Sequence, residues 1–195
     1  LNSSIDNFDA ISFREEEIAN YIAEMTKLTI PNVCLDPTLL LSANDWENLI
    51  NNYWKSRKYV AVYQVRGNKQ QQQYVLNAAN RISKEIGNDI EVIDLSSMKY
   101  SVEDFVSIIK FASYVVTSSF HATVFSIIFK TSFKAVLLDD GLDSRYLNLI
   151  DSLKLSHVTC HVGDKISYMN TNYTDIEDNL YSLKQFSTNY LKRFL

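Results

Sequence analysis

Short apolar runs alternate with amphipathic stretches along most of the chain. The runs 59–65, 90–95, 114–117, 133–138 and 157–161 predict buried β-strands. The stretches 69–86, 102–112, 121–130 and 144–153 carry apolar residues at helical spacing, and a last amphipathic helix is predicted over 175–194. Buried strands separated by helices are typical of a parallel sheet that is covered on both faces. The predicted fold class is therefore α/β, a Rossmann-like three-layer domain with a mostly parallel sheet.

The leading part of the chain shows the same alternation on a smaller scale. Residues 8–13 and 32–35 predict two strands, and residues 15–28 between them predict a helix whose apolar positions are Ile18, Tyr21, Ile22 and Met25. Ser42 predicts the N-cap of a further helix that runs to about residue 54, and the polar residues 55–58 suggest a joint. The joint suggests a small leading piece, followed by a complete trailing unit.

Composition and charge narrow the classes of function. A net charge of -4 over 195 residues argues against nucleic-acid binding, which needs a basic surface. No apolar run approaches the length of about 20 residues that a membrane-spanning helix needs. Cys34 and Cys160 each lie in an apolar run, which favours buried free thiols in a reducing compartment over a disulfide. The oligomeric state is left open, and a homo-oligomer is compatible with the sequence.

Ser119 and His121 lie where a predicted strand ends and a helix begins. In α/β sheets this edge binds ligands, and the free N–H groups of the helix start attract anions. Histidine can give or take a proton near neutral pH. Position alone leaves two interpretations open, a catalytic turn and a capping turn whose histidine only binds a neighbour.

Two arginines occupy the same kind of position. Arg14 follows the strand 8–13, and Arg145 lies just beyond the strand 133–138. The Arg14 guanidinium can hold a carboxylate or phosphate through two parallel hydrogen bonds. The competing interpretation of Arg14 is an ion pair with Glu15 or Glu17.

No metal site is predicted. The acidic stretch 139–143 lacks the spacing of a calcium loop, and we expect an ordinary loop in which Ser144 caps the next helix and Arg145 faces a cleft. His157, Cys160 and His161 lack a nearby fourth ligand for zinc.

Several motifs occur together in a specific order. These are Ile11-Ser-Phe-Arg14-Glu15, Leu35-Asp-Pro-Thr-Leu-Leu40, Val116-Thr-Ser-Ser-Phe-His-Ala-Thr-Val-Phe-Ser126 and Asp143-Ser-Arg145. The ordered set resembles the polysaccharide pyruvyl transferase family over nearly the whole chain. Members of that family are similar to GT-B glycosyltransferases. The resemblance therefore implies that residues 57–195 are the C-terminal, Rossmann-like, donor-binding domain of a GT-B fold. It also implies that residues 1–56 are the tail of a truncated N-terminal Rossmann-like domain.

The resemblance also implies a reaction and a set of roles. A pyruvyl group moves from phosphoenolpyruvate to a sugar of a surface polysaccharide, without a further cofactor, in the bacterial cytoplasm or at the inner face of the membrane. His121 is the expected general acid, Arg14 and Arg145 the expected anion holders, and Ser119 the expected phosphate contact. Many members carry Arg-Leu-His where this chain has Ser119-Phe120-His121, so a hydroxyl replaces one cation.

Two other functions remain open at this point. A GT-B-like glycosyltransferase would use a nucleotide sugar and would need a carboxylate for the donor ribose near the end of a helix. Glu103 and Asp104 lie at the start of the predicted helix 102–112 and not near its end, so they match this requirement poorly. A non-catalytic α/β binding module of the response-regulator kind would need paired acids after the first strand, and Arg14-Glu15-Glu16 matches that pattern poorly.

Overall fold

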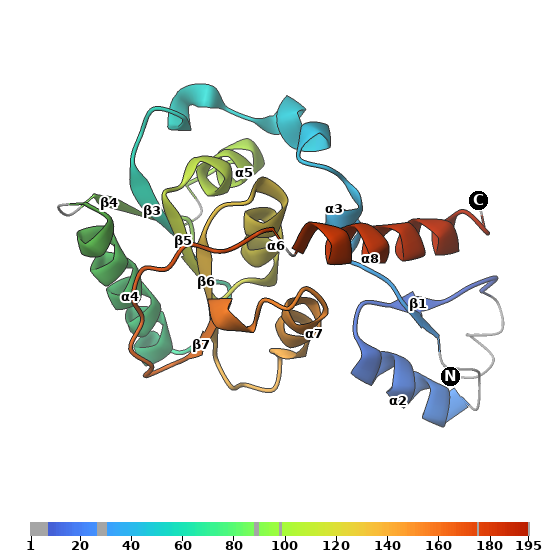
Figure 1. Cartoon of the computed structure of the whole chain (residues 1–195). Coiled ribbons are helices and arrows are strands. Elements are labelled where there is room, and N and C mark those ends of the chain that lie inside the picture. The colour runs from blue at the N-terminus through green and yellow to red at the C-terminus, as the bar shows by residue number, and fades with distance from the viewer. Residues whose placement is uncertain (1–7, 27–30, 88–89, 98, 175, 195) are drawn as a thin grey trace.

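The computed structural model describes residues 8–26, 31–87, 90–97, 99–174 and 176–194. Its centre is a five-stranded, all-parallel sheet in the order β4-β3-β5-β6-β7 (Figure 1). The strands are β3 (Tyr59–Tyr63), β4 (Glu91–Asp94), β5 (Tyr114–Thr117), β6 (Phe133–Leu137) and β7 (Thr159–His161). The α/β class, the parallel sheet and the three-layer arrangement predicted from the apolar runs are confirmed.

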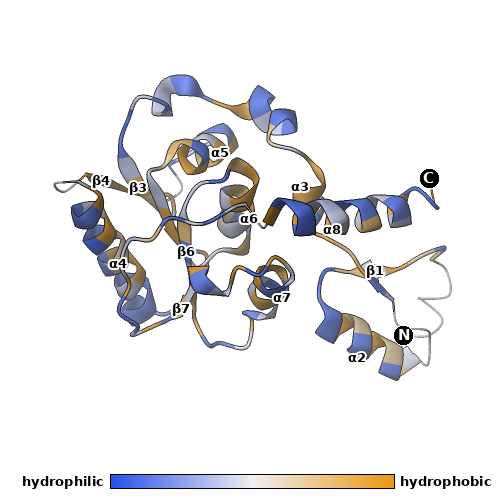
Figure 2. Cartoon of the chain, viewed as in Figure 1, coloured by the Kyte–Doolittle hydropathy of each residue, from blue (hydrophilic) through white to orange (hydrophobic). Residues whose placement is uncertain are grey.

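Helices cover both faces of this sheet because its strands are apolar on both sides (Figure 2). On β3, Val60 and Val62 pack with α4 (Lys69–Gly87) on one face. Tyr59 and Ala61 pack on the other face. That second face is covered by α5 (Val102–Phe111), α6 (Phe120–Phe129) and α7 (Ser144–Ser152). Ser101 caps α5, and Asp104 completes the capping box.

The order of the strands places a topological switch point between β3 and β5. The chain runs from β3 outward to β4, and then crosses back to the other side of β3 to form β5. The two strands pair with Tyr63 opposite Thr117, so both end at the same level. In open α/β sheets, ligands bind in the crevice outside the carboxyl ends of the strands at this point.

The leading part of the chain forms a second, two-stranded parallel sheet of β1 (Ser12–Phe13) and β2 (Asn32–Val33). Both strands are shorter than predicted. Helix α2 (Glu16–Thr26) follows β1, and residues 27 and 28 of the predicted helix lie outside the described residues. This helix buries Ala19, Ala23 and Thr26, whereas its apolar residues Ile18, Tyr21 and Met25 are exposed.

The predicted helix from Ser42 to about residue 54 is wrong. The chain instead forms the short helix α3 (Pro37–Leu40) and two 3₁₀ helices, η1 (Asn44–Leu49) and η2 (Asn52–Trp54). The side chain of Asn51 accepts a hydrogen bond from the N–H of Tyr53 at 3.0 Å. Such local bonds from asparagine compete with a continuous α-helix. The predicted strand 157–161 likewise begins with a 3₁₀ turn, η3 (Ser156–Val158), before β7.

The last helix, α8 (Ile176–Leu191), leaves the large sheet and packs against the leading part of the chain (Figure 1). The N–H of Leu35 donates to Ser187 Oγ at 2.9 Å, and Lys184 Nζ donates to the carbonyl of Leu41 at 2.9 Å. Tyr190 donates its hydroxyl to the carbonyl of Ile11 at 2.7 Å. Residue 175, the predicted start of the helix, lies outside the described residues, and the predicted boundary near residue 56 stays a prediction. In the part of the chain that the structure describes, no helix has the length and apolarity needed to cross a membrane.

Candidate functional site

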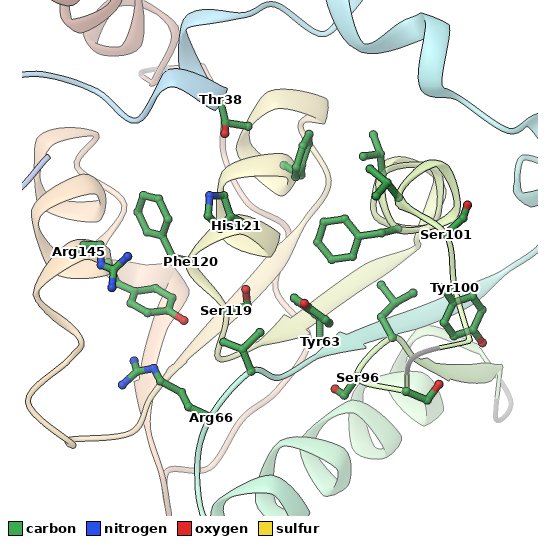
Figure 3. A pocket seen from close by; sticks show the side chains of 18 of the residues that line it. Thr38, Tyr63, Arg66, Ser96, Tyr100, Ser101, Ser119, Phe120, His121 and Arg145 are labelled. Atoms are coloured by element: carbon green, nitrogen blue, oxygen red, sulfur yellow. The ribbon is translucent and has the colours of Figure 1, made fainter.

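A cleft of about 720 Å³ opens at the carboxyl end of the large sheet, at the switch point (Figure 3). Its walls come from the segments that follow β3, β4, β5 and β6. Among the side chains that line it are Thr38, Tyr63, Arg66, Ser96, Tyr100, Ser101, Phe105, Ser119, Phe120, His121, Arg145 and Tyr146. Three of the four predicted site residues, Ser119, His121 and Arg145, therefore face one cleft.

Ser119 and His121 belong to the start of α6. Ser119 occupies the N-cap position, but its side chain makes no capping bond, and its own N–H donates to Thr117 Oγ1 at 2.9 Å. Its hydroxyl points into the cleft (Figure 3). The first N–H groups of an α-helix have no partner within the helix, so the hydroxyl and the helix start together offer hydrogen bonds to an anion.

Arg14 and His121 share a carboxylate that the sequence reasoning did not single out. Arg14 Nη1 is hydrogen-bonded to Asp36 Oδ2, and His121 Nε2 lies 3.9 Å from the same oxygen. The Asp36 side chain is only 3% exposed. Burial would raise the pKa of Asp36, but hydrogen bonds from Thr38 and Arg14 outweigh it and hold that pKa below its usual range. Asp36 is thus an anion that faces both the guanidinium and the imidazole.

Arg14 itself does not line the large cleft. It lines a small neighbouring cavity, to which Asp36, Phe120 and Arg145 also contribute. The ion pair expected as the competing interpretation forms, but with Asp36 rather than with Glu15 or Glu17.

Glu15, which follows β1 of the small sheet, forms an ion pair with Arg145, which lies in α7 beside the large sheet. The Arg145 Nε lies 3.2 Å from Glu15 Oε1, and Ser144 Oγ donates to Glu15 Oε2 at 2.8 Å. The terminal nitrogens of Arg145 have no partner among the described residues. Because a guanidinium carries five N–H donors, Arg145 can bind an anion in the cleft while Glu15 fixes its orientation.

The prediction that Ser144 caps α7 is wrong. Asp143 occupies the N-cap position, and its carboxylate accepts hydrogen bonds from the N–H groups of Leu138 and Asp139 at 2.9 and 2.8 Å. Ser144 is then free to contact Glu15.

Arg66 is a cleft residue that the sequence reasoning missed, although it directly follows a predicted strand. Its two terminal nitrogens are hydrogen-bonded to Asp140 and Asp143, so its charge is neutralised within the protein. The hydroxyl of Tyr146 donates to the carbonyl of Ser118 beside it. These contacts hold the segment after β6 against the segments after β3 and β5, which fixes the shape of the cleft.

The remaining candidate groups lie outside the cleft. In the described residues no group of three or more His, Cys, Asp and Glu side chains is placed to hold a metal ion. His161 contacts Asp139, with 2.9 Å between Nδ1 and Oδ1. Cys34 and Cys160 are both free and buried, as predicted.

The comparisons with known proteins agree with the motifs in the chain. A family model described as "Polysaccharide pyruvyl transferase" matches residues 1–137. That stretch includes Arg14, Asp36, Ser119 and His121, and ends before Arg145. Neither a curated protein nor a solved structure matches the chain.

Proposed function

The chain belongs to the polysaccharide pyruvyl transferase family, and we propose that its cleft transfers a pyruvyl group from phosphoenolpyruvate to a sugar of a surface polysaccharide. The observation that carries the proposal is the convergence of His121, Ser119 and Arg145 on one cleft at the start of α6. A proton donor, a helix start and a guanidinium with free nitrogens suit a small donor that carries both phosphate and carboxylate.

In this proposal the helix start binds the donor phosphate. Ser119 Oγ and the first N–H groups of α6 donate hydrogen bonds to the phosphate oxygens. Arg145 binds the donor through its terminal nitrogens, and Glu15 keeps it in place. Arg14 acts on the same anion from the neighbouring cavity, or positions Asp36 beside His121.

His121 is the proposed general acid. It transfers its proton to the methylene carbon of phosphoenolpyruvate, which becomes a methyl group, and positive charge develops at C2. One sugar hydroxyl attacks C2 and loses its proton to His121. The C2–O bond to phosphate then breaks, a second hydroxyl attacks C2, and its proton leaves with the phosphate. The products are a cyclic ketal and inorganic phosphate, so atoms and charges balance without a redox step.

The two alternatives receive less support from the contacts. A glycosyltransferase would need a carboxylate for the ribose of its donor, and no Asp or Glu is among the described residues that line the cleft. Asp104 is engaged by Trp54, whose Nε1 donates to it at 2.9 Å. A purely binding module would not require a histidine paired with a buried carboxylate at the helix start.

A calorimetric titration tests the proposal. Phosphoenolpyruvate and a panel of nucleotide sugars are titrated into the chain and into the variants Arg145→Ala and His121→Asn. We expect phosphoenolpyruvate alone to bind, and Arg145→Ala to weaken it by about 10-fold or more, because a charge-assisted hydrogen bond is lost. His121→Asn should bind it within about threefold of the parent chain yet release no phosphate when pyranosides are added.

Arg57→Ala is the matched control. Arg57 also forms an ion pair, with Glu91, but it precedes β3 and so lies at the opposite end of the sheet. Its removal should leave phosphoenolpyruvate affinity unchanged. Binding of nucleotide sugars without phosphoenolpyruvate, or an equal effect of Arg57→Ala and Arg145→Ala, would refute the proposed donor site.

A further inference from the structure

The cleft has two ends of different chemistry. One end, the cationic end, holds Ser119, His121 and Arg145, the proposed donor site. The other, the aromatic end, lies between β3 and α5 and is lined by Tyr63, Ser96, Tyr100, Ser101 and Phe105. The described residues at the aromatic end that line the cleft include no charged side chain. A volume of about 720 Å³ is typical of sites for ligands much larger than phosphoenolpyruvate, so the donor leaves this end unfilled.

We propose that the aromatic end binds the pyranose that accepts the pyruvyl group. This inference rests on the proposed function and adds the location of its second substrate.

The rings of the aromatic end form a fixed row. Tyr63 and Phe105 meet edge to face with centroids 4.8 Å apart, and Phe105 meets Phe125 at 5.9 Å. Phe125 in turn meets Trp46 at 4.9 Å. Each ring is held by the next, so the surface keeps its shape when no ligand is present. Flat apolar surfaces of this kind complement the C–H face of a pyranose ring.

Polar groups with spare hydrogen-bonding capacity accompany the rings. The hydroxyls of Tyr63 and Tyr100 make no hydrogen bond to another described residue. Ser96 Oγ accepts from the N–H of Gln64 at 2.9 Å, which leaves the proton of its hydroxyl available. Ser101 Oγ accepts from the N–H of Asp104 at 3.1 Å, and its side chain also interacts with Glu103. Trp46 also lines the cleft, and its buried Nε1 lacks an acceptor within the described part of the chain.

This combination selects a neutral, hydroxylated ligand. A pyranose presents an apolar face and a rim of hydroxyls, which match the rings and the free hydroxyls. A nucleoside diphosphate would need cationic side chains here to neutralise its phosphates, and a hydrocarbon would leave the hydroxyls of Tyr63 and Tyr100 unpaired. The chemistry of the aromatic end therefore favours a saccharide over both.

The backbone places the aromatic end next to the donor site. Tyr63 and Thr117 are paired residues on adjacent strands, and Thr117 Oγ1 donates to the carbonyl of Tyr63 at 2.5 Å. The N–H of Ser118 binds the same carbonyl at 3.2 Å. Adjacent strands lie about 4.8 Å apart, and Figure 3 shows Tyr63 and Ser119 facing the same cavity below His121. A pyranose on Tyr63 thus brings its hydroxyls to the carbon that His121 activates.

Ligand-observed NMR titrations test the inference with a panel of methyl pyranosides. The variants are Tyr63→Phe and Tyr100→Phe, which keep the rings and remove one hydroxyl each. Tyr181→Phe is the control, because that side chain is 65% exposed on α8. At least one pyranoside should bind, and Tyr63→Phe and Tyr100→Phe should each weaken it by about 2–10-fold, the effect of one hydrogen bond. Tyr181→Phe should not change its affinity.

Phosphoenolpyruvate titrations on the same variants separate this inference from the proposed function. The inference is supported when Tyr63→Phe and Tyr100→Phe weaken the pyranoside and leave phosphoenolpyruvate affinity unchanged. If phosphoenolpyruvate binds but every pyranoside binds without regard to Tyr63 and Tyr100, or none binds, the inference is overturned and the donor site stands. If nucleotide sugars alone bind and depend on Tyr63 and Tyr100, both are overturned.

Discussion

Asp36 connects the small and the large sheet at the site, because it pairs with Arg14 and faces His121. Removing its charge tests whether this connection stabilises the fold. The substitution Asp36→Asn keeps an oxygen that accepts from the N–H of Thr38, a bond of 2.9 Å, and removes the charge that faces Arg14 and His121. The effect on stability is therefore that of the charge pair rather than that of the helix cap.

The magnitude follows from the burial of the two partners. Breaking a fully buried ion pair costs about 3–5 kcal/mol, and breaking an exposed one costs about 0.2–1 kcal/mol. The Asp36 side chain is 3% exposed, whereas that of Arg14 is 40% exposed and can be rehydrated. We therefore expect Asp36→Asn to lower the free energy of unfolding by about 1–3 kcal/mol, which for a chain of this length lowers Tm by about 2–4 °C for each kcal/mol.

The contribution of Asp36 to the free energy of unfolding should depend on pH in a defined direction. The pKa of Asp36 is below its usual range in the folded protein, so the ionised carboxylate stabilises the fold. That contribution is complete above the unfolded pKa of about 3.9 and is lost as the pH falls through the folded pKa. The difference in stability between the parent chain and Asp36→Asn should accordingly shrink below about pH 4.

Urea denaturation followed by circular dichroism measures these quantities. Glu91→Gln is the control, because it breaks the exposed pair with Arg57 and should cost less than about 1 kcal/mol. Combining Asp36→Asn with Arg14→Gln in a double-mutant cycle should give a coupling of at least about 0.5 kcal/mol. A loss no larger than that of Glu91→Gln, or one that persists unchanged at low pH, would show that the pair with Arg14 does not stabilise the fold.

Glu15→Gln should weaken phosphoenolpyruvate binding by about 2–5-fold in calorimetry, because the ion pair that orients Arg145 is lost; tighter binding would instead mean that Glu15 acts on Arg145 mainly as a competing anion. Burial raises the pKa of Cys160 to about 11, so in Cys34→Ser the remaining thiol should react with Ellman's reagent only after unfolding, and rapid reaction in the native state would contradict this. The hydrogen bond that His161 donates to the Asp139 carboxylate raises the pKa of His161, so Asp139→Asn should lower that pKa in an NMR titration, whereas an unchanged pKa would exclude that cause. Gly67→Ala should cost about 1–2 kcal/mol, because Gly67 has φ +104° and its added Cβ would lie 3.3 Å from Leu138, while Gly87→Ala, with open space around it, serves as a control that should cost nothing.

The large sheet could be predicted from the sequence because the apolar runs, the helical spacing and the turn residues all indicate the same elements there. Strands β3 and β5 are apolar runs, whereas β4 contains Glu91 and Asp94 and β6 contains Lys134, and each strand is followed by polar or small residues that precede a helix. In the segment 42–54 the apolar spacing and the local side-chain hydrogen bonds indicate different structures. Trp46, Leu49 and Ile50 have a spacing that both α and 3₁₀ helices satisfy. The local bonds that Asn51 accepts from the N–H of Tyr53 and that Asp45 accepts from the N–H of Ser42 favour short turns.

The site could be predicted in part for a similar reason. Ligands bind at the carboxyl ends of parallel strands, and this rule locates Ser119, His121 and Arg145 because it depends only on the order of strands and helices along the chain. The partners of these residues could not be found in this way. Glu15 is 129 positions from Ser144, and Asp36 contacts His121 only because a second sheet is placed opposite the first. Such contacts depend on the arrangement of the two sheets, which no local pattern encodes.

That arrangement explains why so many charged residues meet at one place. Both sheets are parallel, and both direct their carboxyl ends toward the site: Arg14 and Glu15 follow β1, Asp36 lies beyond β2, and His121 lies beyond β5. Helix α8 holds the two sheets in this relation through its contacts with the segments around β1 and β2. Because Asp36 and Glu15 come from the smaller sheet, any shift of that sheet changes which anion faces His121 and Arg145. The described residues of α8 do not line the cleft, but its contacts with the smaller sheet connect it to the segments that carry Asp36 and Glu15.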